Sequence, residues 1–387
     1  MTRDSTDFST CCALLVEDSI INQQLIRAML DAMGIGRVEV ATNGLEGLDM
    51  AASLRPDIII LDIMMPKLDG FGFLERFRAD PANDDTPVIV TTALGEQPER
   101  VRAFDLGAAD YVVKPIDRRE FTARVSVHLR SRLLVGRLSR YRDRLGRDLS
   151  AARDMQLALL PGPERVKAVE AAYGVRLASV FRSSDELGGD LWDVIALGPQ
   201  AFAVYLVDFT GHGVAAAINT FRLHVMMARK QDLLTDPAAL LERVNQTLLG
   251  VLRRGQFAAM VHAVFHMERG VVEVAMAAAP GPIHRDPTGL VRLISESSHP
   301  LGLVPEARYR SLELPFAPGH GLLLHSDGLI EAADADGNLF GDEGARRLAA
   351  GYSGDLEAEI EALMRAGWRF DDDLSMVWVE RVGDPPP

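Results

Sequence analysis

The first third of the chain alternates short apolar runs, rich in β-branched residues, with amphipathic segments of helical spacing. Two clear examples of these amphipathic segments are residues 22–33 and 44–54. This order of elements predicts a parallel sheet with helices on both faces, which is the α/β doubly wound fold. The five predicted strands are 13–16, 38–41, 58–61, 88–91 and 111–113.

Residues 128–161 show a different pattern, that of one long helix which Pro161 stops. The apolar residues are spaced 4, 3, 4, 4 and 3 positions apart, a heptad-like stripe with one irregular step. A solvated spacer is the alternative interpretation, since Gly136 and Gly146 each weaken a helix by about 1 kcal/mol relative to Ala. We favour a helical coiled-coil linker because such a stripe must bury one face. Its members are Leu134, Leu138, Tyr141, Leu145, Leu149 and Ala152.

The remainder of the chain contains predicted strands, and two long helical patterns, 215–230 and 237–252, intervene between the second and third of them. Strands with a pair of helices packed against them suggest an α+β sandwich. The predicted domains are therefore 1–127 and 162–383, joined by the linker 128–161 and followed by a disordered tail at 384–387. The predicted strands of the last domain are 175–181, 202–208, 260–266, 271–277, 290–294 and 322–326.

Composition and charge narrow the class of protein without identifying a function. A length of 387 residues exceeds one ordinary core and suits two domains. The net charge of −14 disfavours a broad nucleic-acid surface, although the linker alone carries eight arginines against three acids. Cys11 and Cys12 are adjacent and allow no disulfide framework, and no apolar run reaches the ~18 residues of a membrane span. We therefore expect a cytoplasmic protein that binds neither DNA nor membranes.

Polar side chains gather where the strands of the first domain end. The carboxyl ends of parallel strands meet at one edge of the sheet, where such folds place their function. Carboxylates this close repel unless a cation lies among them, and oxygen ligands suit Mg²⁺. One carboxylate could then attack a phosphorus atom while a lysine neutralises the phosphoryl oxygens. Asp18 alone is more simply explained as a helix cap. The full set is Glu17, Asp18, Asp62, Thr91, Thr92 and Lys114.

Four acidic loops lie in the last domain, and in each an Asp adjoins Gly or a small polar residue. Clustered Asp without Cys suits two Mg²⁺ or Mn²⁺ ions, which would activate a water and hold a phosphoryl group. Any one loop taken alone is better explained as a turn, because Asp-Gly pairs are common turn signals. The four loops are 187–193, 207–213, 325–328 and 371–375.

Residues 13–127 resemble the receiver domain of two-component response regulators, which implies a flavodoxin-like fold. The motifs follow in the family's order, and their spacings agree with those of the family. They are Glu17-Asp18, LDIMMPKLDG around Asp62, TTA with Thr92, and YVVKP with Lys114.

The resemblance implies that Asp62 accepts a phosphoryl group from a sensor histidine kinase and that the Lys114–Pro115 bond is cis. Met64 and Leu94 follow Asp62 and Thr92 by two positions, and neither apolar side chain can orient a hydrolytic water. We therefore expect an aspartyl phosphate that outlasts seconds. The implied Mg²⁺ ligands are Glu17, Asp18, Asp62 and the carbonyl of Met64, and the implied switch residues are Thr92, Tyr111 and Lys114.

Residues 149–380 resemble the PP2C-type serine/threonine phosphatases, in the bacterial SpoIIE/RsbU-like subfamily that regulates sigma factors. The motifs GGDLWD, VDFTGHGVAAA, HSDGLIEA, FGDEG and DDDLS follow in the family's order. The resemblance implies a PP2C-like β-sandwich with two Mn²⁺ or Mg²⁺ ions, Asp208 bridging them and the carbonyl of Phe209 beside it. The implied catalytic and metal-binding acids are Asp190, Asp208, Asp327 and Asp372.

Three positions depart from that family's pattern. Ala277–Ala279 stands where the family has Ala-Gly-His, His320 stands where it has Asp, and Thr210 replaces the usual Ser. None of the three is a metal-binding acid, so we expect an active enzyme. We assign no proton transfer to His212, because a lone His is more often structural.

These observations lead to one functional hypothesis. We expect a response regulator whose phosphorylation at Asp62 controls a metal-dependent protein serine/threonine phosphatase. We also expect the chain to form a homodimer through the linker helix. By the resemblance, its substrate would be a phosphorylated anti-sigma-factor antagonist of the STAS type. The alternative is a catalytically inactive adaptor or anti-sigma binding protein, which the altered Ala277–Ala279 turn favours and the four retained acids oppose. A DNA-binding regulator is disfavoured by the charge and by the lack of a basic recognition helix.

Overall fold

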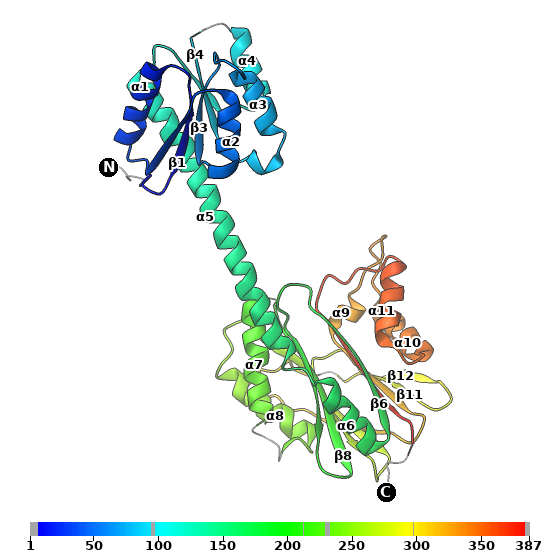
Figure 1. The fold of residues 1–387 in the computed structure, drawn as a ribbon. Coiled ribbons are helices and arrows are strands. Elements are labelled where there is room, and N and C mark those ends of the chain that lie inside the picture. Colours follow the sequence, from blue (N-terminus) through cyan, green and yellow to red (C-terminus); the bar gives the residue numbers. More distant parts are fainter. Residues whose placement is uncertain (1–6, 94–96, 212, 229–232, 297, 384–387) are drawn as a thin grey trace. The chain divides into compact units, whose positions relative to one another are not determined.

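The computed structural model describes residues 7–93, 97–211, 213–228, 233–296 and 298–383. The chain divides into two compact units, Met1–Leu145 and Gly146–Pro387. Figure 1 shows the helices and strands of each unit.

The first unit is a five-stranded parallel sheet in the order β2-β1-β3-β4-β5. One face packs against α1 and α5, through residues such as Ile26 and Phe121, and the other face packs against α2, α3 and α4. The predicted doubly wound fold is therefore confirmed, with every predicted strand within one residue of its observed bounds. The elements are β1 Cys12–Val16, α1 Ile20–Ala32, β2 Arg37–Ala41, α2 Gly44–Leu54, β3 Ile58–Asp62, α3 Gly70–Arg78, η1 Pro81–Asn83, β4 Val88–Thr92, α4 Gln97–Asp105 and β5 Asp110–Val113.

Helix α5, Arg118–Leu157, is a single helix of 40 residues that starts as the last helix of the sheet domain and ends in the second unit. It therefore begins ten residues before the predicted linker and ends four residues before Pro161. Four members of the predicted stripe are exposed in the single chain: Leu134, Leu138, Tyr141 and Leu145. The coiled coil thus stays a prediction, because these side chains find no burial within one copy of the protein.

The second unit contains two antiparallel five-stranded sheets, in the orders β13-β10-β9-β8-β7 and β12-β11-β14-β15-β6. Its strands are β6 Val175–Arg182, β7 Asp190–Ala196, β8 Ala201–Phe209, β9 Ala258–His266, β10 Val271–Ala277, β11 Ile283–Arg285, β12 Val291–Leu293, β13 Ser311–Pro315, β14 Gly321–His325 and β15 Leu374–Arg381. Its helices are α6 Pro163–Tyr173, α7 Val214–Ala228, α8 Pro237–Leu249, α9 Asp327–Ile330, α10 Gly341–Gly351 and α11 Leu356–Arg365.

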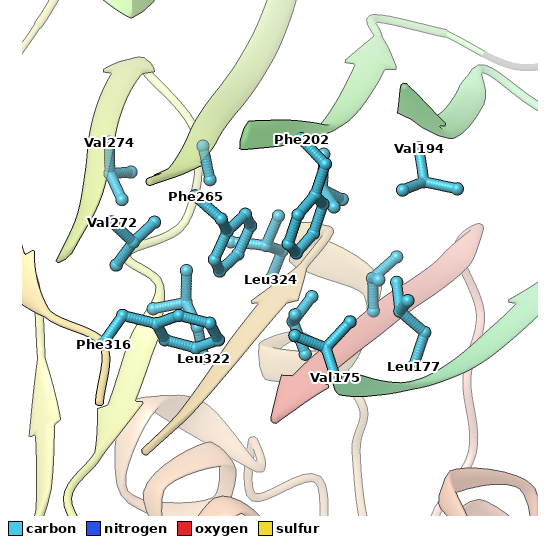
Figure 2. Close-up of a cluster of buried hydrophobic side chains, with 14 of the residues drawn as sticks. Val175, Leu177, Val194, Phe202, Phe265, Val272, Val274, Phe316, Leu322 and Leu324 are labelled. Atoms are coloured by element: carbon cyan, nitrogen blue, oxygen red, sulfur yellow. The ribbon is translucent and has the colours of Figure 1, made fainter. Parts of the chain in front are cut away.

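The main core of this unit lies between the two sheets (Figure 2). Phe202 and Phe265 stack with their ring centroids 4.5 Å apart, and Phe316 meets Phe265 edge-on. Helices α7 and α8 cover the outer face of the first sheet, and α9, α10 and α11 cover that of the second (Figure 1). The unit is therefore a sandwich of two sheets between two helical layers.

The sequence predicted six of these ten strands and two of the helices. Strands β7 and β15 were missed because each starts at an acidic motif that had been interpreted as a loop. Strands β11 and β13 were also missed. In the described part of the chain, no helix combines the length and apolar character needed to span a bilayer.

Candidate phosphorylation and metal sites

The first unit brings three acids together at the carboxyl end of its sheet. Glu17 and Asp18 follow β1, and Asp62 ends the neighbouring strand β3. Each of the three offers an oxygen, and these oxygens all lie within 4.8 Å of one another. Glu17 and Asp62 are buried, whereas Asp18 is exposed. The three predicted acids therefore form a cluster of oxygen ligands that fits Mg²⁺.

Lys114 lies within this acidic cluster. Its Nζ is 2.8 Å from Glu17 Oε2 and 2.8 Å from Asp62 Oδ2. Burial alone would lower the pKa of Lys114, but its bonds to Asp62 and Glu17 raise the pKa above the ordinary value. Burial raises the pKa of Asp62, and Lys114 opposes that shift. The cluster thus carries its own cation, which can neutralise negative charge at Asp62.

The other predicted receiver residues surround Asp62 at different depths. The backbone N–H of Met64 lies 3.4 Å from Asp62 Oδ1, and the Met64 side chain is exposed. Thr92 is buried at the end of β4, beside β3. Tyr111 is half-buried on β5, and its hydroxyl accepts a 2.9 Å hydrogen bond from Arg100. The Lys114–Pro115 bond is cis, whereas Leu94 lies outside the described residues.

The second unit places its four predicted acids on two sheets. Asp190 begins β7 and is paired with Asp208 of β8 in the strand register. Asp327 starts α9 directly after β14, and Asp372 precedes β15. Among the described residues these acids do not form a group of three within 4.8 Å, unlike those of the first unit.

Burial and neighbouring acids raise the pKa values of three of these residues, Asp190, Asp208 and Asp327. Burial, reinforced by the charge of Asp208, raises the pKa of Asp190 well above its ordinary value. Burial followed by Asp327 and Asp372 raises the pKa of Asp208 to about 7. Burial and Asp372 raise that of Asp327 to about 6. The shifts show that the four acids act on one another electrostatically.

Asp190 differs from the acids of the first unit because no basic side chain among the described residues balances its charge. It is 1% exposed, and neither carboxylate oxygen has a hydrogen-bond partner in the structure. Over the described ranges, no Lys, Arg or His side chain forms an ion pair with Asp190, Asp208, Asp327 or Asp372. Asp208 and Asp327 are half-buried, and Asp372 is exposed. A buried carboxylate without a compensating charge is costly, so Asp190 and the acids near it fit divalent cations.

Gly189 allows several oxygen atoms to lie close to the backbone beside Asp190. A Cβ atom there would lie 2.4 Å from the carbonyl oxygen of Phe209 and 3.2 Å from Asp208 Oδ1. It would also lie 3.2 Å from the carbonyl oxygen of Gly211. The missing side chain therefore lets two backbone carbonyls approach Asp208, including the Phe209 carbonyl that the sequence predicted.

Asp373 is a residue that sequence reasoning missed. It is buried, and its carboxylate accepts hydrogen bonds from the backbone N–H groups of Ser184 and Gly189, at 2.8 and 2.6 Å. It thereby fixes the loop that leads into Asp190. The run of three Asp at 371–373 was a signal, but the sequence alone does not show which of them is buried.

Gln156, near the end of α5, also contacts this loop. Its Nε2 donates a 2.8 Å hydrogen bond to the carbonyl of Gly188, and its Oε1 accepts a 3.2 Å bond from the Gly188 N–H. Nε2 also lies 3.4 Å from the hydroxyl of Thr220 on α7. Gln156 is 2% exposed, so the end of α5 is bonded directly to the residue two positions before Asp190.

Of the three departures from the family's pattern, the alanine run contains an unusual backbone conformation, whereas His320 and Thr210 make ordinary contacts. Ala278 has a left-handed φ of 50°, and its N–H donates to the Ser298 hydroxyl. His320 packs against the His284 ring, with the centroids 5.2 Å apart. The Thr210 hydroxyl donates to the carbonyl of Phe257 and accepts from its N–H.

Two further residues of the acidic motifs have structural surroundings. Asp193 is buried and pairs with Arg165 of α6 at 3.0 Å, while Trp192 lies in the core between the sheets. His212 lies outside the described residues.

The folds of the two units agree with comparisons to known proteins. Residues 13–126 match the response regulator receiver domain family, and residues 198–382 match the stage II sporulation protein E (SpoIIE) family. The chain therefore carries a response regulator receiver domain followed by a SpoIIE domain of the PP2C type.

Individual relatives cover only parts of the chain. The DNA-binding dual master transcriptional regulator RpaA of Synechocystis sp. is 40% identical over 117 residues, which are 30% of this chain and 48% of that protein. Response regulator MprA of Mycobacterium avium is 42% identical over 117 residues, 30% of this chain and 50% of that protein. The chain thus spans about half the length of these relatives.

A solved structure resembles the second unit. The SiaA-PP2C domain of Pseudomonas aeruginosa covers 62% of this chain and 98% of its own, with a TM-score of 0.53 and 22% identity. This likeness establishes the PP2C-like fold.

Proposed function

We propose that this chain is a two-component response regulator whose phosphorylation at Asp62 controls a metal-dependent protein serine/threonine phosphatase. The observation that carries the enzyme assignment is the buried Asp190 carboxylate, which has no hydrogen-bond partner and lies beside Asp208, whose own pKa is raised by Asp327 and Asp372. A fold that maintained such a cluster without an ion would lose stability through desolvation and repulsion.

The residues of the SpoIIE domain would act as metal ligands. Asp190, Asp327, Asp372 and the Phe209 carbonyl would hold two divalent ions, with Asp208 between them. Bound ions of this kind supply an activated water and neutralise phosphoryl oxygens. Asp373 keeps the 184–189 loop in place through its bonds to Ser184 and Gly189.

Phosphate release from a phosphoserine peptide in the presence of Mn²⁺ tests this proposal, with Asp208→Asn as the blank. We expect turnover by the wild type and none above background by the variant. Equal, background rates would instead support the catalytically inactive adaptor or anti-sigma binding protein, the second candidate, which the substituted Ala277–Ala279 turn favours.

In the receiver domain, Asp62 would accept the phosphoryl group from a sensor histidine kinase. Glu17, Asp18 and the Met64 carbonyl would hold Mg²⁺ beside it. Lys114, already 2.8 Å from Asp62, would pair with the phosphoryl oxygens, and Thr92 and Tyr111 would change position in response. We propose that phosphorylation activates the phosphatase, and that its substrate is a phosphorylated anti-sigma-factor antagonist of the STAS type.

Helix α5 would transmit the receiver's state. It starts in the receiver domain and reaches Gly188 through Gln156. We propose that the exposed stripe of Leu134, Leu138, Tyr141 and Leu145 pairs with the same stripe of a second copy, as a parallel coiled-coil homodimer.

The variant Leu138→Asp plus Leu145→Asp tests the dimer. We expect a monomer by light scattering whose phosphatase activity no longer changes with beryllofluoride. Ser150→Asp plus Ala151→Asp, on exposed positions outside the stripe, is the matched control and should remain dimeric. A Leu138/Leu145 variant that stays dimeric and responsive would refute the linker proposal.

The contact of Gln156 with Gly188 has a test of its own. Gln156→Leu removes three hydrogen-bonding contacts with little change in volume. We expect the ratio of phosphatase activities with and without beryllofluoride to fall toward one, while Asp62 phosphorylation is unchanged. Met155→Leu, at an exposed neighbouring position, should keep the wild-type ratio.

A further inference from the structure

An apolar cavity lies between α10 and α11 of the SpoIIE domain, outside the acidic site. Its volume is about 310 Å³, and its apolar lining includes Phe340, Leu348, Leu363 and Trp368. The charged side chains of Arg347 and Glu359 also line it. A cavity of this size, mostly apolar with a few polar groups, is typical of a binding pocket.

The cavity is close to the metal-binding acids along the chain. Trp368 precedes Asp372 by four residues, and a chain spans at most ~3.6 Å per residue, so their Cα atoms lie within about 14 Å. Phe340 is tied to the same region, since its ring meets Trp368 edge-on at 5.1 Å. Its N–H also donates to the carbonyl of Ala332, two residues after α9, which Asp327 starts.

Arg182 connects the helical layer to the acidic site more directly. It ends β6 and is paired with Leu374, the residue after Asp373, in the strand register. Its guanidinium lies 2.8 Å from the sulfur of Met364 and pairs with Glu357, both on α11. Helix α11 is therefore anchored next to the acids, and the cavity on it keeps a defined distance from them.

We propose that this cavity takes an apolar side chain of the phosphoprotein substrate and so contributes to substrate choice. An extended peptide advances about 3.4 Å per residue, so a span of up to ~14 Å corresponds to an apolar residue within about four positions of the phosphoserine. The occupant would be a leucine-sized side chain, which the apolar lining suits. The proposal rests on the phosphatase function proposed above.

The experiment uses full-length protein with Mn²⁺ and two kinds of substrate. p-Nitrophenyl phosphate reports the metal site alone. A set of phosphoserine peptides, each with a single Leu walked through an otherwise Ser- and Gly-containing sequence, reports the cavity. Ala362→Phe fills the cavity from an exposed position that lines it, and Ala358→Phe makes the same change on α11 at an exposed position that does not.

We expect one Leu position, within about four residues of the phosphoserine, to raise kcat/KM about tenfold. Ala362→Phe should abolish that preference, Ala358→Phe should keep it, and both should hydrolyse p-nitrophenyl phosphate at the wild-type rate. The proposal is overturned by the absence of a preferred Leu position, or by a preference that survives Ala362→Phe.

Failure of the phosphatase function itself would be distinguishable. It would appear as no hydrolysis of p-nitrophenyl phosphate by the wild type, and binding of the same labelled peptides, followed by fluorescence anisotropy, would still test the cavity. A change of oligomeric mass in Ala362→Phe but not in Ala358→Phe would assign the cavity to a second copy of the chain and overturn the proposal.

Discussion

The receiver and SpoIIE domains each gather carboxylates, but they balance the charge differently. In the receiver domain, Lys114 lies 2.8 Å from both Glu17 and Asp62, so a cation of the chain itself occupies the cluster. In the SpoIIE domain, the pKa values of Asp190 and Asp208 are raised, and both oxygens of Asp190 lack a partner.

We relate this difference in charge balance to the function proposed for each site. A receiver must keep its fold whether or not Asp62 carries a phosphoryl group, and an internal lysine provides charge balance without it. The proposed phosphatase would need ions at positions where they can also contact substrate, and a lysine there would compete with them.

The largest expected effect comes from removing the receiver's internal cation. Lys114→Met leaves Glu17 and Asp62 buried without their cationic partner, and breaking a buried pair in this way costs about 3–5 kcal/mol of unfolding free energy. Hydrogen exchange of the β1 and β3 amides measures it. Lys67→Met, at an exposed site of the same domain, is the control. Unchanged protection in Lys114→Met would show that the receiver acids do not depend on their lysine.

A pH effect is expected in the SpoIIE domain, at the buried His262. Burial lowers its pKa from 6.5 to about 4, so the unfolded chain binds a proton that the folded domain excludes. Stability is therefore complete above pH 6.5 and declines as the pH falls toward 4, by about 3 kcal/mol.

All three tryptophans, Trp192, Trp368 and Trp378, lie in the SpoIIE domain, so urea unfolding followed by their fluorescence reports this domain alone. His262→Gln stays neutral and can still donate to the Leu234 carbonyl, which accepts from His262 at 2.9 Å. The wild type should lose about 3 kcal/mol more than this variant between pH 7 and pH 4. Parallel losses in the two proteins would contradict the assignment.

The third prediction concerns how much metal binding stabilises the SpoIIE domain. Mn²⁺ at a hundred times its Kd should raise the unfolding free energy of the SpoIIE domain by about 2.7 kcal/mol. Asp190→Asn removes a buried like charge, so it should be more stable than the wild type without metal and gain less from Mn²⁺. The same tryptophan signal measures both proteins. A wild type that gains nothing from Mn²⁺ would remove the proposed contrast between the two sites.

The receiver was predictable because its central strands β1, β3 and β4 are buried on both faces and therefore appear as continuous apolar runs. The parallel arrangement then fixed which residues meet, since Glu17, Asp62 and Lys114 follow strands that end at one edge. In the SpoIIE domain, β7 and β15 start at acids and loops, so their first residues carry the signal of a turn rather than of a strand.

Residues whose role depends on distant contacts could not be found in this way. Asp373 bonds to Ser184, 189 positions away, and Gln156 bonds to Gly188, 32 positions away. Nothing local distinguishes a buried Gln near the end of a helix of exposed residues from a solvated one. Only the packing of β15 and α5 against the 184–189 loop gives these two side chains their partners.

Gly189 has a consequence for how the SpoIIE domain can vary. The oxygens that its missing side chain admits belong to the backbone of Phe209 and Gly211, so no substitution at 209 can delete the oxygen there. In a saturation mutagenesis experiment, position 209 should tolerate other large apolar residues, whereas Gly189→Ala should score as a null allele. Part of this centre is thus encoded by the path of the chain, and one added methyl group would be enough to erase it.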